Sequence, residues 1–420
     1  MGAGCCTKLY EDYNGLICKR YSAWKKPKNH PKKRATLSKN YKCLPNNFTK
    51  TDNCLFTFGL AGIQNMGNTC FISAALQCLS NTQPLTDFFL SGLHEVEKCS
   101  RFNGEISSVY GDFVKAQWND EFEYIQPGNF CHLIQEITSQ FSPDEPQDTQ
   151  EFLEFILNSL HEELNRSLKI GKAKFIEDIE DENEAHAADA WKECLIYNAS
   201  VIIDLFQGQY KSTIKCMKCQ YQRIIYEPFI IITVPILNIE NCTLDMCIKE
   251  FTKREILSND DSWVCGGCGY KGKAKKKFDI WKFPPVLIVS FKRMQFKQPG
   301  ALKNDELVKF PIKDYDLSDH TIGPQKSKPI YKLFAIIDYY GFGNSGHFIA
   351  RCKNFRDQKW YSFDDKKVTQ VTDEEELITN SAYVLFYHKD NLKAFPVQSP
   401  DNPNFWPHCK AENSIKVTDV

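Results

Sequence analysis

Two pairs of cysteines constrain the fold of this 420-residue chain more than any other feature of its sequence. Each pair has the spacing Cys-x-x-Cys, and 45 residues separate the pairs, whose members are Cys216, Cys219, Cys265 and Cys268. Four thiolates in two such pairs suit tetrahedral zinc, and four protein ligands leave no open position for a water molecule. We therefore expect one structural Zn²⁺ that brings two distant segments together. The alternative is four cysteines without a metal.

The start of the chain and its apolar segments bear on the cellular compartment. Met1-Gly-Ala-Gly-Cys-Cys has no apolar core behind it, which predicts no secretory signal. The longest apolar stretch, Phe229 to Leu237, is far shorter than the roughly 18 residues of a membrane span. We expect a soluble protein in a reducing compartment, cytoplasmic or nuclear, where its 18 cysteines serve metal binding or catalysis rather than disulfides.

Charge divides the chain into a basic arm and an acidic body. Residues 1–50 carry 12 Lys and Arg against two acidic residues, a net of +10, whereas residues 51–420 carry 40 basic and 51 acidic residues, a net of −11. This composition predicts a disordered arm over residues 1–57, and four prolines predict a poorly ordered tail over residues 391–420. An acidic body disfavours nucleic acid as a partner and suits a basic polypeptide.

Hydrophobic periodicity predicts helices in the first half of the chain and strands in the second. Apolar residues recur at helical spacing over residues 69–79, 106–118, 130–141 and 152–164. Short β-branched or aromatic runs bounded by turn residues predict strands over residues 229–234, 286–291, 331–338, 348–352, 359–363 and 383–387. Between the halves, the acidic residues 177–184 predict a solvated loop or an exposed helix end. The expected fold class is α+β.

Cys70 opens the strongest of the predicted helices. A thiol at a helix N-terminus lies where backbone N–H groups and the helix dipole favour the thiolate, which makes it a nucleophile. Asn65 and the turn at Gly67 place amide donors just ahead of the sulfur, as a developing oxyanion requires. The alternative is a buried structural cysteine, which is how we interpret Cys78 two turns further on.

His347 is the histidine best placed to accept a proton from a thiol. It follows the glycine-rich loop 341–346 and begins a strand. If the strands over residues 348–353 and 359–365 pair with residue numbers summing to about 712, His347 lies opposite Asp365 and next to Asp364. The hairpin thus predicts a carboxylate within reach of the imidazole. The alternative is a solvated histidine at a strand edge.

Several stretches of the chain resemble the ubiquitin-specific protease family of the papain-like cysteine protease clan. Residues 62–73, Gly-Ile-Gln-Asn-Met-Gly-Asn-Thr-Cys-Phe-Ile-Ser, are similar to its nucleophile box. Residues 331–337, 346–348, 360–365 and 382–387 are similar, in order and spacing, to its histidine box. The resemblance implies that Cys70 is the nucleophile, Asn65 the oxyanion donor and His347 the general base. It also implies that Asp364 orients the histidine, with Asp365 as a further helper.

The resemblance also implies residues that contact the substrate. Pro146-Gln-Asp-Thr-Gln-Glu-Phe-Leu153 is similar to a family box that usually begins Gln-Gln-Asp and departs from it at Pro146. The aspartate of that box holds the extended ubiquitin tail, which assigns Gln147 and Asp148 to substrate binding. Tyr339, where many members have histidine, lies beside the same tail. An alternative for Asp148 is a helix N-cap, with Glu151 completing a capping box.

The same resemblance implies the architecture and the activity. It covers residues 58–390 as a catalytic domain with a helical thumb, a β-sheet palm and zinc-tipped fingers over roughly residues 206–282. The implied reaction is hydrolysis of the isopeptide bond between the terminal glycine of ubiquitin and a lysine of a target protein or ubiquitin chain, so the partners are ubiquitin and ubiquitinated proteins. The alternatives are a ubiquitin-binding scaffold without turnover and a protease acting on ordinary peptides, which would leave the zinc pairs unexplained.

The arm contains elements of a lipid anchor. Gly2 is exposed once Met1 is removed, Cys5 and Cys6 follow, and a basic cluster extends from Lys19 to Lys39. A myristoyl chain with palmitate or a polybasic patch would give peripheral membrane association. The myristoylation motif expects Ser or Thr at the position of Cys6. The alternatives are a solvated arm and a nuclear address.

Overall fold

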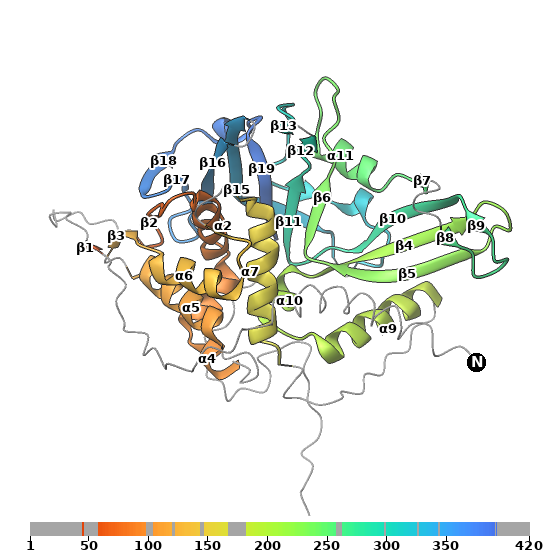
Figure 1. Ribbon diagram of the computed structural model, residues 1–420, viewed down its shortest axis with the longest axis horizontal. Coiled ribbons are helices and arrows are strands. Elements are labelled where there is room, and N and C mark those ends of the chain that lie inside the picture. Colours follow the sequence, from red (N-terminus) through yellow and green to blue (C-terminus); the bar gives the residue numbers. More distant parts are fainter. Residues whose placement is uncertain are drawn as a thin grey trace, which may run out of the picture.

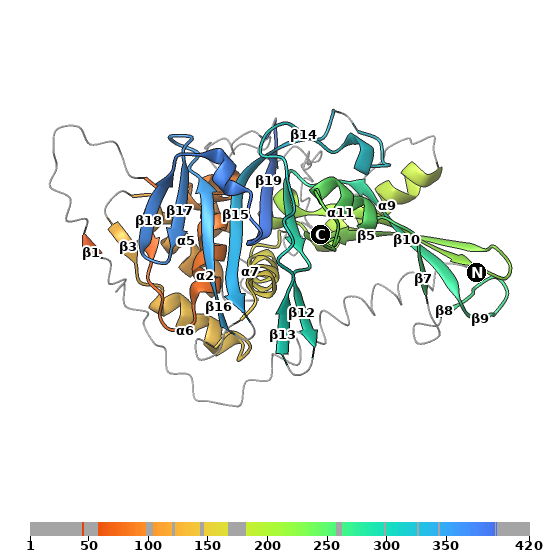
Figure 2. The same cartoon turned by 90° about the horizontal axis from the view of Figure 1, so that it is seen from above.

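The computed structural model describes residues 44–45, 58–97, 104–119, 122–142, 147–166, 182–257, 263–297, 300–325, 327–342, 345–390 and 392. The predicted arm, apart from residues 44–45, and the predicted tail, apart from residue 392, lie outside these ranges. So do the lipidation residues Gly2, Cys5 and Cys6, and Pro146. The described residues form a helical part, a central sheet and a long sheet that projects to one side (Figures 1 and 2).

The helical part is the predicted thumb. Its helices are α2 Cys70–Ser80, α3 Gln83–Leu90, α4 Leu93–Glu97, α5 Glu105–Gln117, α6 Gly128–Ile137 and α7 Thr149–Glu163. All eleven residues of α2 are buried, and the ring of Phe71 lies 5.4 Å from that of Phe152 on α7. The four predicted helices are confirmed, although α6 ends four residues early, because its C-cap Thr138 is extended. Beside the helices lies a small sheet of β1 Leu44–Pro45, β3 Phe122–Ile125 and β2 Gly62–Ile63.

The central sheet is the predicted palm. Its strand order is β18-β17-β16-β15-β19-β11-β6, with β14 paired to β15, and all pairs are antiparallel except β11 with β6. The strands are β6 Ile231–Val234, β11 Val286–Phe291, β14 Tyr315–Asp316, β15 Ile330–Phe342, β16 Ser345–Lys353, β17 Trp360–Asp364, β18 Lys367–Val371 and β19 Ala382–Lys389. Successive residues of β11 enter two different cores: Val286 and Ile288 pack with the helices, and Leu287 and Val289 pack on the other face.

The projecting sheet is the predicted fingers, and its strand order is β5-β4-β10-β7. Its strands are β4 Gly208–Cys216, β5 Gln222–Phe229, β7 Glu255–Leu257 and β10 Ala274–Lys282, and the hairpin β8 Trp263–Val264 with β9 Lys271–Gly272 lies at its tip (Figure 1). The remaining elements are α9 Glu182–Tyr197, α10 Val201–Phe206, α11 Leu244–Phe251, the hairpin β12 Met294–Lys297 with β13 Gly300–Lys303, and short 3-10 helices at Ser318–His320 and Glu374–Leu377. Part of the acidic run is a helix end, because α9 begins at Glu182.

None of the helices in the described ranges combines the length and the apolar character that crossing a bilayer requires.

Candidate active site and metal centre

Asn65 organises the loop ahead of the α2 N-terminus. Its Oδ1 accepts hydrogen bonds from the backbone N–H groups of Gly67 and Thr69, each at 3.1 Å, and from the Thr69 hydroxyl at 3.1 Å. Gly67 has φ 136°, a conformation that L side chains rarely adopt. The expected amide donors of this loop are therefore directed at Asn65, and Cys70 follows as the first residue of the helix, 7% exposed.

Asp365 joins this loop to the palm. The Asn65 Nδ2 group donates to Asp365 Oδ2 at 3.0 Å, and the backbone N–H of Ile63 donates to the Asp365 carbonyl at 2.9 Å. Because an amide NH₂ has two hydrogens, Asp365 uses only one of them. The hydrogen bonds of the described residues give the second Asn65 hydrogen no acceptor.

His347 contacts the carboxylate that the resemblance assigned to it. His347 Nε2 lies 2.7 Å from Asp364 Oδ1 and 4.0 Å from Asp365 Oδ2. The predicted register was wrong by one residue: Ala350 pairs with Phe363, so the paired residue numbers sum to 713. Position 366 rather than Asp365 therefore corresponds to His347, and Asp364 lies two residues from it on the same face.

Cys70 and the two aspartates change the pKa of His347. The hydrogen bond with the Cys70 thiol is the largest cause that raises the His347 pKa to about 9, the hydrogen bond with Asp364 also raises it, and desolvation opposes both. Because Nε2 is bonded to Asp364, Nδ1 is the nitrogen left for the thiol. The structure thus brings together Cys70, His347, Asp364, Asp365 and Asn65, and the raised pKa favours the imidazolium form of His347.

Asp148 lies at the start of α7 and has two partners. Its Oδ1 accepts from the backbone N–H of Gln150 at 2.7 Å, so it is the N-cap, and its Oδ2 accepts from the Tyr383 hydroxyl at 2.7 Å. Burial raises the Asp148 pKa, and the bond from Tyr383 opposes this shift. Glu151 accepts instead from the Gln140 side chain at 2.9 Å. Sequence reasoning did not single out Tyr383, although it lies within the quoted stretch 382–387.

Gln147 and Tyr339 are the other two residues predicted to contact the substrate. Gln147 directly precedes the N-cap and is half-buried. Tyr339 is buried on β15, and its pKa is raised by burial first and then by the charges of Asp148 and Cys70. A Cβ atom at Gly346 would come within 2.3 Å of the Tyr339 ring, so only glycine fits beside the phenol. Tyr339 is therefore close enough to both Cys70 and Asp148 for their charges to act on it.

The four cysteines of the two pairs converge at the tip of the fingers. Their sulfur atoms all lie within 4.8 Å of one another, with 3.9 Å between Cys216 and Cys268 and 3.6 Å between Cys219 and Cys265. Tetrahedral zinc with Zn–S bonds of about 2.3 Å requires sulfur atoms roughly 3.8 Å apart. The separation of the thiols therefore fits one zinc ion.

The backbone around the cysteines fits the same ion. The N–H of Lys218 points at Cys216 Sγ at 3.4 Å, and the N–H of Gly267 points at Cys265 Sγ at 3.3 Å. Such N–H donors stabilise thiolate ligands. Both turns also place the residue four positions after their first cysteine at positive φ, Gln220 at 64° and Gly269 at 68°. Two turns of one geometry thus face each other across the site.

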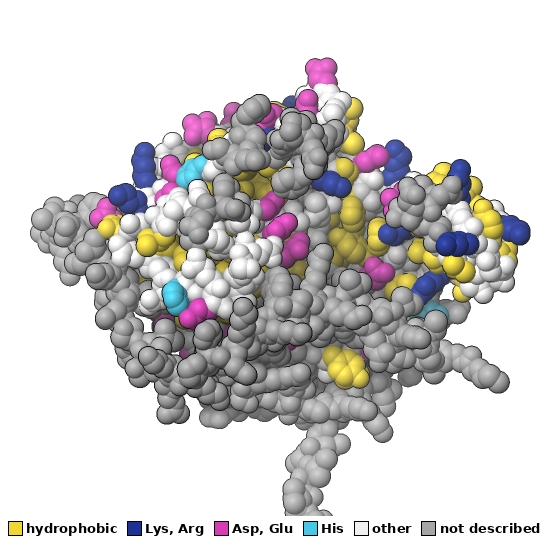
Figure 3. Space-filling view, in the orientation of Figure 1, with side chains coloured by type: hydrophobic (Ala, Val, Ile, Leu, Met, Phe, Trp, Pro, Cys, Tyr) yellow, Lys and Arg dark blue, Asp and Glu magenta, His cyan; other side chains and the backbone are white. Residues whose placement is uncertain are grey.

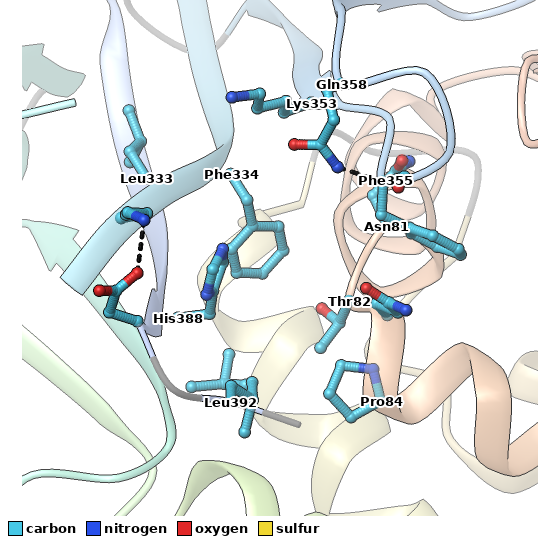
Figure 4. A pocket seen from close by; sticks show the side chains of 14 residues that line it. Asn81, Thr82, Pro84, Leu333, Phe334, Lys353, Phe355, Gln358, His388 and Leu392 are labelled. Carbon is cyan, nitrogen blue, oxygen red and sulfur yellow. Dashed lines mark hydrogen bonds and ion pairs between the residues drawn. The ribbon is translucent and has the colours of Figure 1, made fainter. Parts of the chain in front are cut away.

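A cavity of about 240 Å³ lies elsewhere, between the end of α2 and the edges of β15, β16 and β19 (Figure 4). Its walls include Thr82, Phe334, Phe355, His388 and Leu392. None of the predicted site residues lines it. The thiol chemistry therefore does not take place in this cavity.

The thiol of Cys70 lies at a helix N-terminus and is hydrogen-bonded to the imidazole of His347, which a carboxylate orients from the palm side. This is the arrangement of a papain-like cysteine protease site. Comparison with known proteins supports the same class. A family model described as ubiquitin carboxyl-terminal hydrolase matches residues 61–387. This protein belongs to the ubiquitin carboxyl-terminal hydrolase family.

Relatives and solved structures support this assignment. Ubiquitin carboxyl-terminal hydrolase Usp2 of Drosophila melanogaster is 32% identical over 332 residues, which cover 79% of this chain and 35% of that protein. Ubiquitin carboxyl-terminal hydrolase 21 of Homo sapiens is 32% identical over 351 residues, which cover 78% of this chain and 61% of that protein. The SAGA Ubp8/Sgf11/Sus1/Sgf73 DUB module bound to ubiquitin aldehyde includes a chain similar in structure, with 26% identity and a TM-score of 0.62, covering 80% of this chain and 71% of that one. The chain spans between about a third and three fifths of the length of these curated relatives.

Proposed function

We propose that this protein is a deubiquitinating cysteine protease that hydrolyses the isopeptide bond between the terminal glycine of ubiquitin and a lysine of a target protein or ubiquitin chain. The observation that carries the proposal is the hydrogen-bonded set of Cys70, His347 and Asp364 on a chain whose family model covers residues 61–387. Residues 58–390 would form the catalytic unit.

In the first half of the reaction, the Cys70 thiolate attacks the carbonyl carbon of the terminal glycine. The second amide hydrogen of Asn65 binds the oxygen as it becomes negative. When the C–N bond breaks, the His347 imidazolium gives its proton to the leaving lysine amine, and a thioester remains on Cys70. Asp364 stabilises the imidazolium and holds the ring in position.

In the second half, water attacks the thioester and His347 accepts its proton. The sulfur departs as a thiolate while His347 keeps the proton taken from water, and the ubiquitin carboxylate is released with its acid proton passing to solvent, so that the thiolate–imidazolium pair forms again. The proton that His347 gives to the leaving amine is thus replaced by one taken from water in the same cycle.

The substrate would be held near Asp148. Its carboxylate is fixed by the Gln150 N–H and the Tyr383 hydroxyl, so it is ready to accept from the backbone or a basic side chain of an extended tail. We assign Gln147 and Tyr339 to the binding of the same tail, because Gln147 directly precedes Asp148 and the charges of both Asp148 and Cys70 act on Tyr339. The partners are ubiquitin and ubiquitinated proteins.

We propose that Cys216, Cys219, Cys265 and Cys268 hold one structural zinc ion, whose bonds would clamp two distant turns together. The separation of the sulfur atoms and the two N–H donors support this assignment. The catalytic residues lie in the thumb and palm, so the ion would stabilise the fingers rather than act on the substrate.

A ubiquitin carrying a C-terminal electrophile, followed by mapping of the modified residue, tests the proposed function. We expect modification of Cys70 alone, and loss of both modification and turnover in Cys70→Ala, with ubiquitin binding retained. Binding without modification would instead identify a ubiquitin-binding scaffold. Hydrolysis of unstructured peptides as rapid as that of a ubiquitin conjugate would identify a general protease.

For the cellular location we propose the cytoplasm or nucleus, where the thiols stay reduced. Tethering to a membrane through a lipid on Gly2, with Cys5 and Cys6 as sites for a second lipid, is the alternative that a mass measurement of the N-terminus would reveal.

A further inference from the structure

The fingers differ in charge from the rest of the folded body. Residues 208–229 and 263–282, which form most of the projecting sheet and its tip, carry ten Lys and Arg against two acidic residues. The net of +8 contrasts with −11 for residues 51–420 as a whole. In Figure 3, several Lys and Arg side chains lie beside hydrophobic ones on the fingers, at the right of the view. The basic residues are Lys211, Lys215, Lys218, Arg223, Lys271, Lys273, Lys275, Lys276, Lys277 and Lys282.

The strand register places four of these lysines on one face of the sheet. Lys275 pairs with Lys215, Lys277 with Thr213, and Asp279 with Lys211. Residues directly opposite or two apart along a strand share a face, so Lys211, Lys215, Lys275 and Lys277 form one basic face. We call this surface the lysine face.

Helix α9 covers only the base of the lysine face. The Gln209 side chain donates to the Ala187 carbonyl at 3.0 Å, and Lys211 Nζ donates to the Asn183 side chain at 3.0 Å. Lys277 further along is paired with Asp279. Among the described residues, neither Lys215 nor Lys275 takes part in an ion pair. The outer part of the face therefore has positive charge that the described residues leave unneutralised.

The pairing of Lys215 with Lys275 is unfavourable for the isolated sheet. Like charges directly opposite each other on neighbouring strands destabilise a sheet, whereas opposite charges stabilise it. An anionic partner lying across both lysines would reverse the sign of this interaction. Because the described residues offer neither lysine an ion-pair partner, an anionic partner bound across the pair would gain a stabilising interaction that the sheet itself lacks.

Aliphatic side chains lie among these lysines. Ile256 pairs with Lys275, and Ile224 pairs with Thr213, so both isoleucines belong to the lysine face. Ile256 is 59% exposed and Ile224 is 42% exposed. Positive charge interleaved with exposed aliphatic surface is complementary to a chain that carries both carboxylates and apolar side chains.

We propose that the lysine face binds an acidic polypeptide segment with interspersed apolar side chains, on a partner other than ubiquitin. Nucleic acid fits less well, since Tyr226 and Trp281 on this face pack edge to face at 5.1 Å, with Lys211 Nζ 6.0 and 5.7 Å from their centroids. These rings are thus engaged with each other and with a cation rather than presented as a platform for base stacking. A long polyanion would also meet the acidic remainder of the body. A short acidic segment confined to the fingers avoids that repulsion.

The test uses the full chain and the variant Lys215→Glu. This substitution turns the like-charge pair into an opposite-charge pair with Lys275, so the sheet should be as stable as before or more stable. The same substitution removes one positive charge from the lysine face and adds a negative one, which should weaken binding of an acidic segment about tenfold or more. Lys359→Glu, an exposed position on the β16–β17 turn of the palm, makes the same change of net charge elsewhere and is the matched control.

The probe is a short fluorescein-labelled peptide that alternates Glu and Leu, followed by fluorescence anisotropy. We expect saturable binding that weakens with salt, a loss in Lys215→Glu but not in Lys359→Glu, and weaker binding of a peptide that alternates Glu and Ser. In Lys215→Glu the thermal unfolding temperature should be the same or higher, and the reaction of Cys70 with the ubiquitin electrophile should be unchanged. The proposal would be overturned by equal losses in the two variants, by tighter binding of single-stranded RNA at the same lysine, or by loss of ubiquitin reaction in Lys215→Glu, which would assign the face to ubiquitin. Failure of the peptide experiment with normal labelling of Cys70 would leave the proposed protease function standing.

Discussion

Replacing Asp364 or Asp365 by alanine distinguishes the roles of two carboxylates that lie close to the same imidazole. Asp364 Oδ1 is hydrogen-bonded to His347 Nε2 at 2.7 Å, whereas Asp365 Oδ2 lies 4.0 Å away and is bonded to Asn65 instead. In the roles that we propose, Asp364 acts directly on the imidazolium, and Asp365 acts mainly by positioning Asn65. We expect Asp364→Ala to cost more activity than Asp365→Ala.

The size of the loss follows from the exposure of the pair. A hydrogen bond to a charged group contributes about 1.5–3 kcal/mol when it is shielded from water. Here 35% of the His347 side chain and 48% of the Asp364 side chain are exposed, and solvent screening reduces the contribution to about 1–2 kcal/mol. Since about 1.4 kcal/mol corresponds to a tenfold change in rate, Asp364→Ala should lower kcat/KM roughly 5- to 30-fold. Asp365→Ala, which breaks no hydrogen bond to the ring, should lower it about two- to fivefold.

The assay is hydrolysis of ubiquitin with a fluorogenic C-terminal amide, measured as kcat/KM for each variant. Glu375→Ala removes an exposed carboxylate of the palm for which the described residues provide no hydrogen bond or ion pair, and it is the control for a change of charge alone. Thermal unfolding of each variant shows whether the hairpin remains folded. A larger loss in Asp365→Ala than in Asp364→Ala would refute the assigned roles, although the hairpin geometry would stand.

Four further outcomes follow from the sites. The His347 pKa, raised to about 9 mainly by Cys70, means that the imidazolium is retained up to that pH and lost above it, so a pH profile of kcat/KM should fall as pH rises through about 9. In Asp364→Ala the same fall should move to lower pH, and an unchanged profile would contradict the assignment. Cys265→Ser should remove one zinc per chain by elemental analysis and weaken ubiquitin binding before it alters alkylation of Cys70, whereas metal-free wild-type protein would exclude the site. Gly2→Ala should shift the protein from membrane to soluble fractions if the arm is lipidated, and an unmodified N-terminus with all protein soluble would exclude tethering.

Local sequence patterns were sufficient to predict the loop and the helix that position Cys70. The Asn65 to Cys70 segment and the small apolar residues after it predicted a helix starting at the thiol, and α2 begins at Cys70. The strands of the palm were equally evident, because β11 is buried on both faces and reads as a continuous apolar run. Composition and periodicity therefore predict these elements, with bounds accurate to within a few residues.

The register of the β16–β17 hairpin could not be obtained in this way. Lys353 pairs with Trp360, so six residues form the turn, and within it Gln358 has φ 60°. Glutamine is not a residue whose presence predicts a left-handed conformation, so the extra turn residue could not be predicted from the residue types in the turn. A shift of one residue changed which aspartate was expected opposite His347, and the structure places Asp365 instead in the next turn, with φ 51°.

Lysine-rich strands were missed for a different physical reason. β10 begins Ala-Lys-Lys-Lys, which has neither the alternation nor the β-branched content that predicts a strand, and it is held in place by pairing with β4 and β7. Pairing of this kind is a tertiary effect that overrides local propensity. The lysines that make β10 unrecognisable as a strand from its sequence also contribute to the lysine face. The strand that the sequence pattern did not predict therefore lies in the surface for which we propose a binding role.

The relative position of the nucleophile and its base depends on packing away from both. Helix α2 packs against β16, and deep in this interface the Cys78 Sγ lies 3.9 Å from the Cys352 Sγ, with both residues fully buried. Burial raises the pKa of the Cys78 thiol well above its ordinary value, so this cysteine stays protonated and acts as a small apolar group. Cys78 shares a helix with Cys70, and Cys352 shares a strand with His347. The two catalytic residues are therefore aligned by an apolar contact between rigid elements, and the chemistry of the site depends on a pair of cysteines that take no part in it.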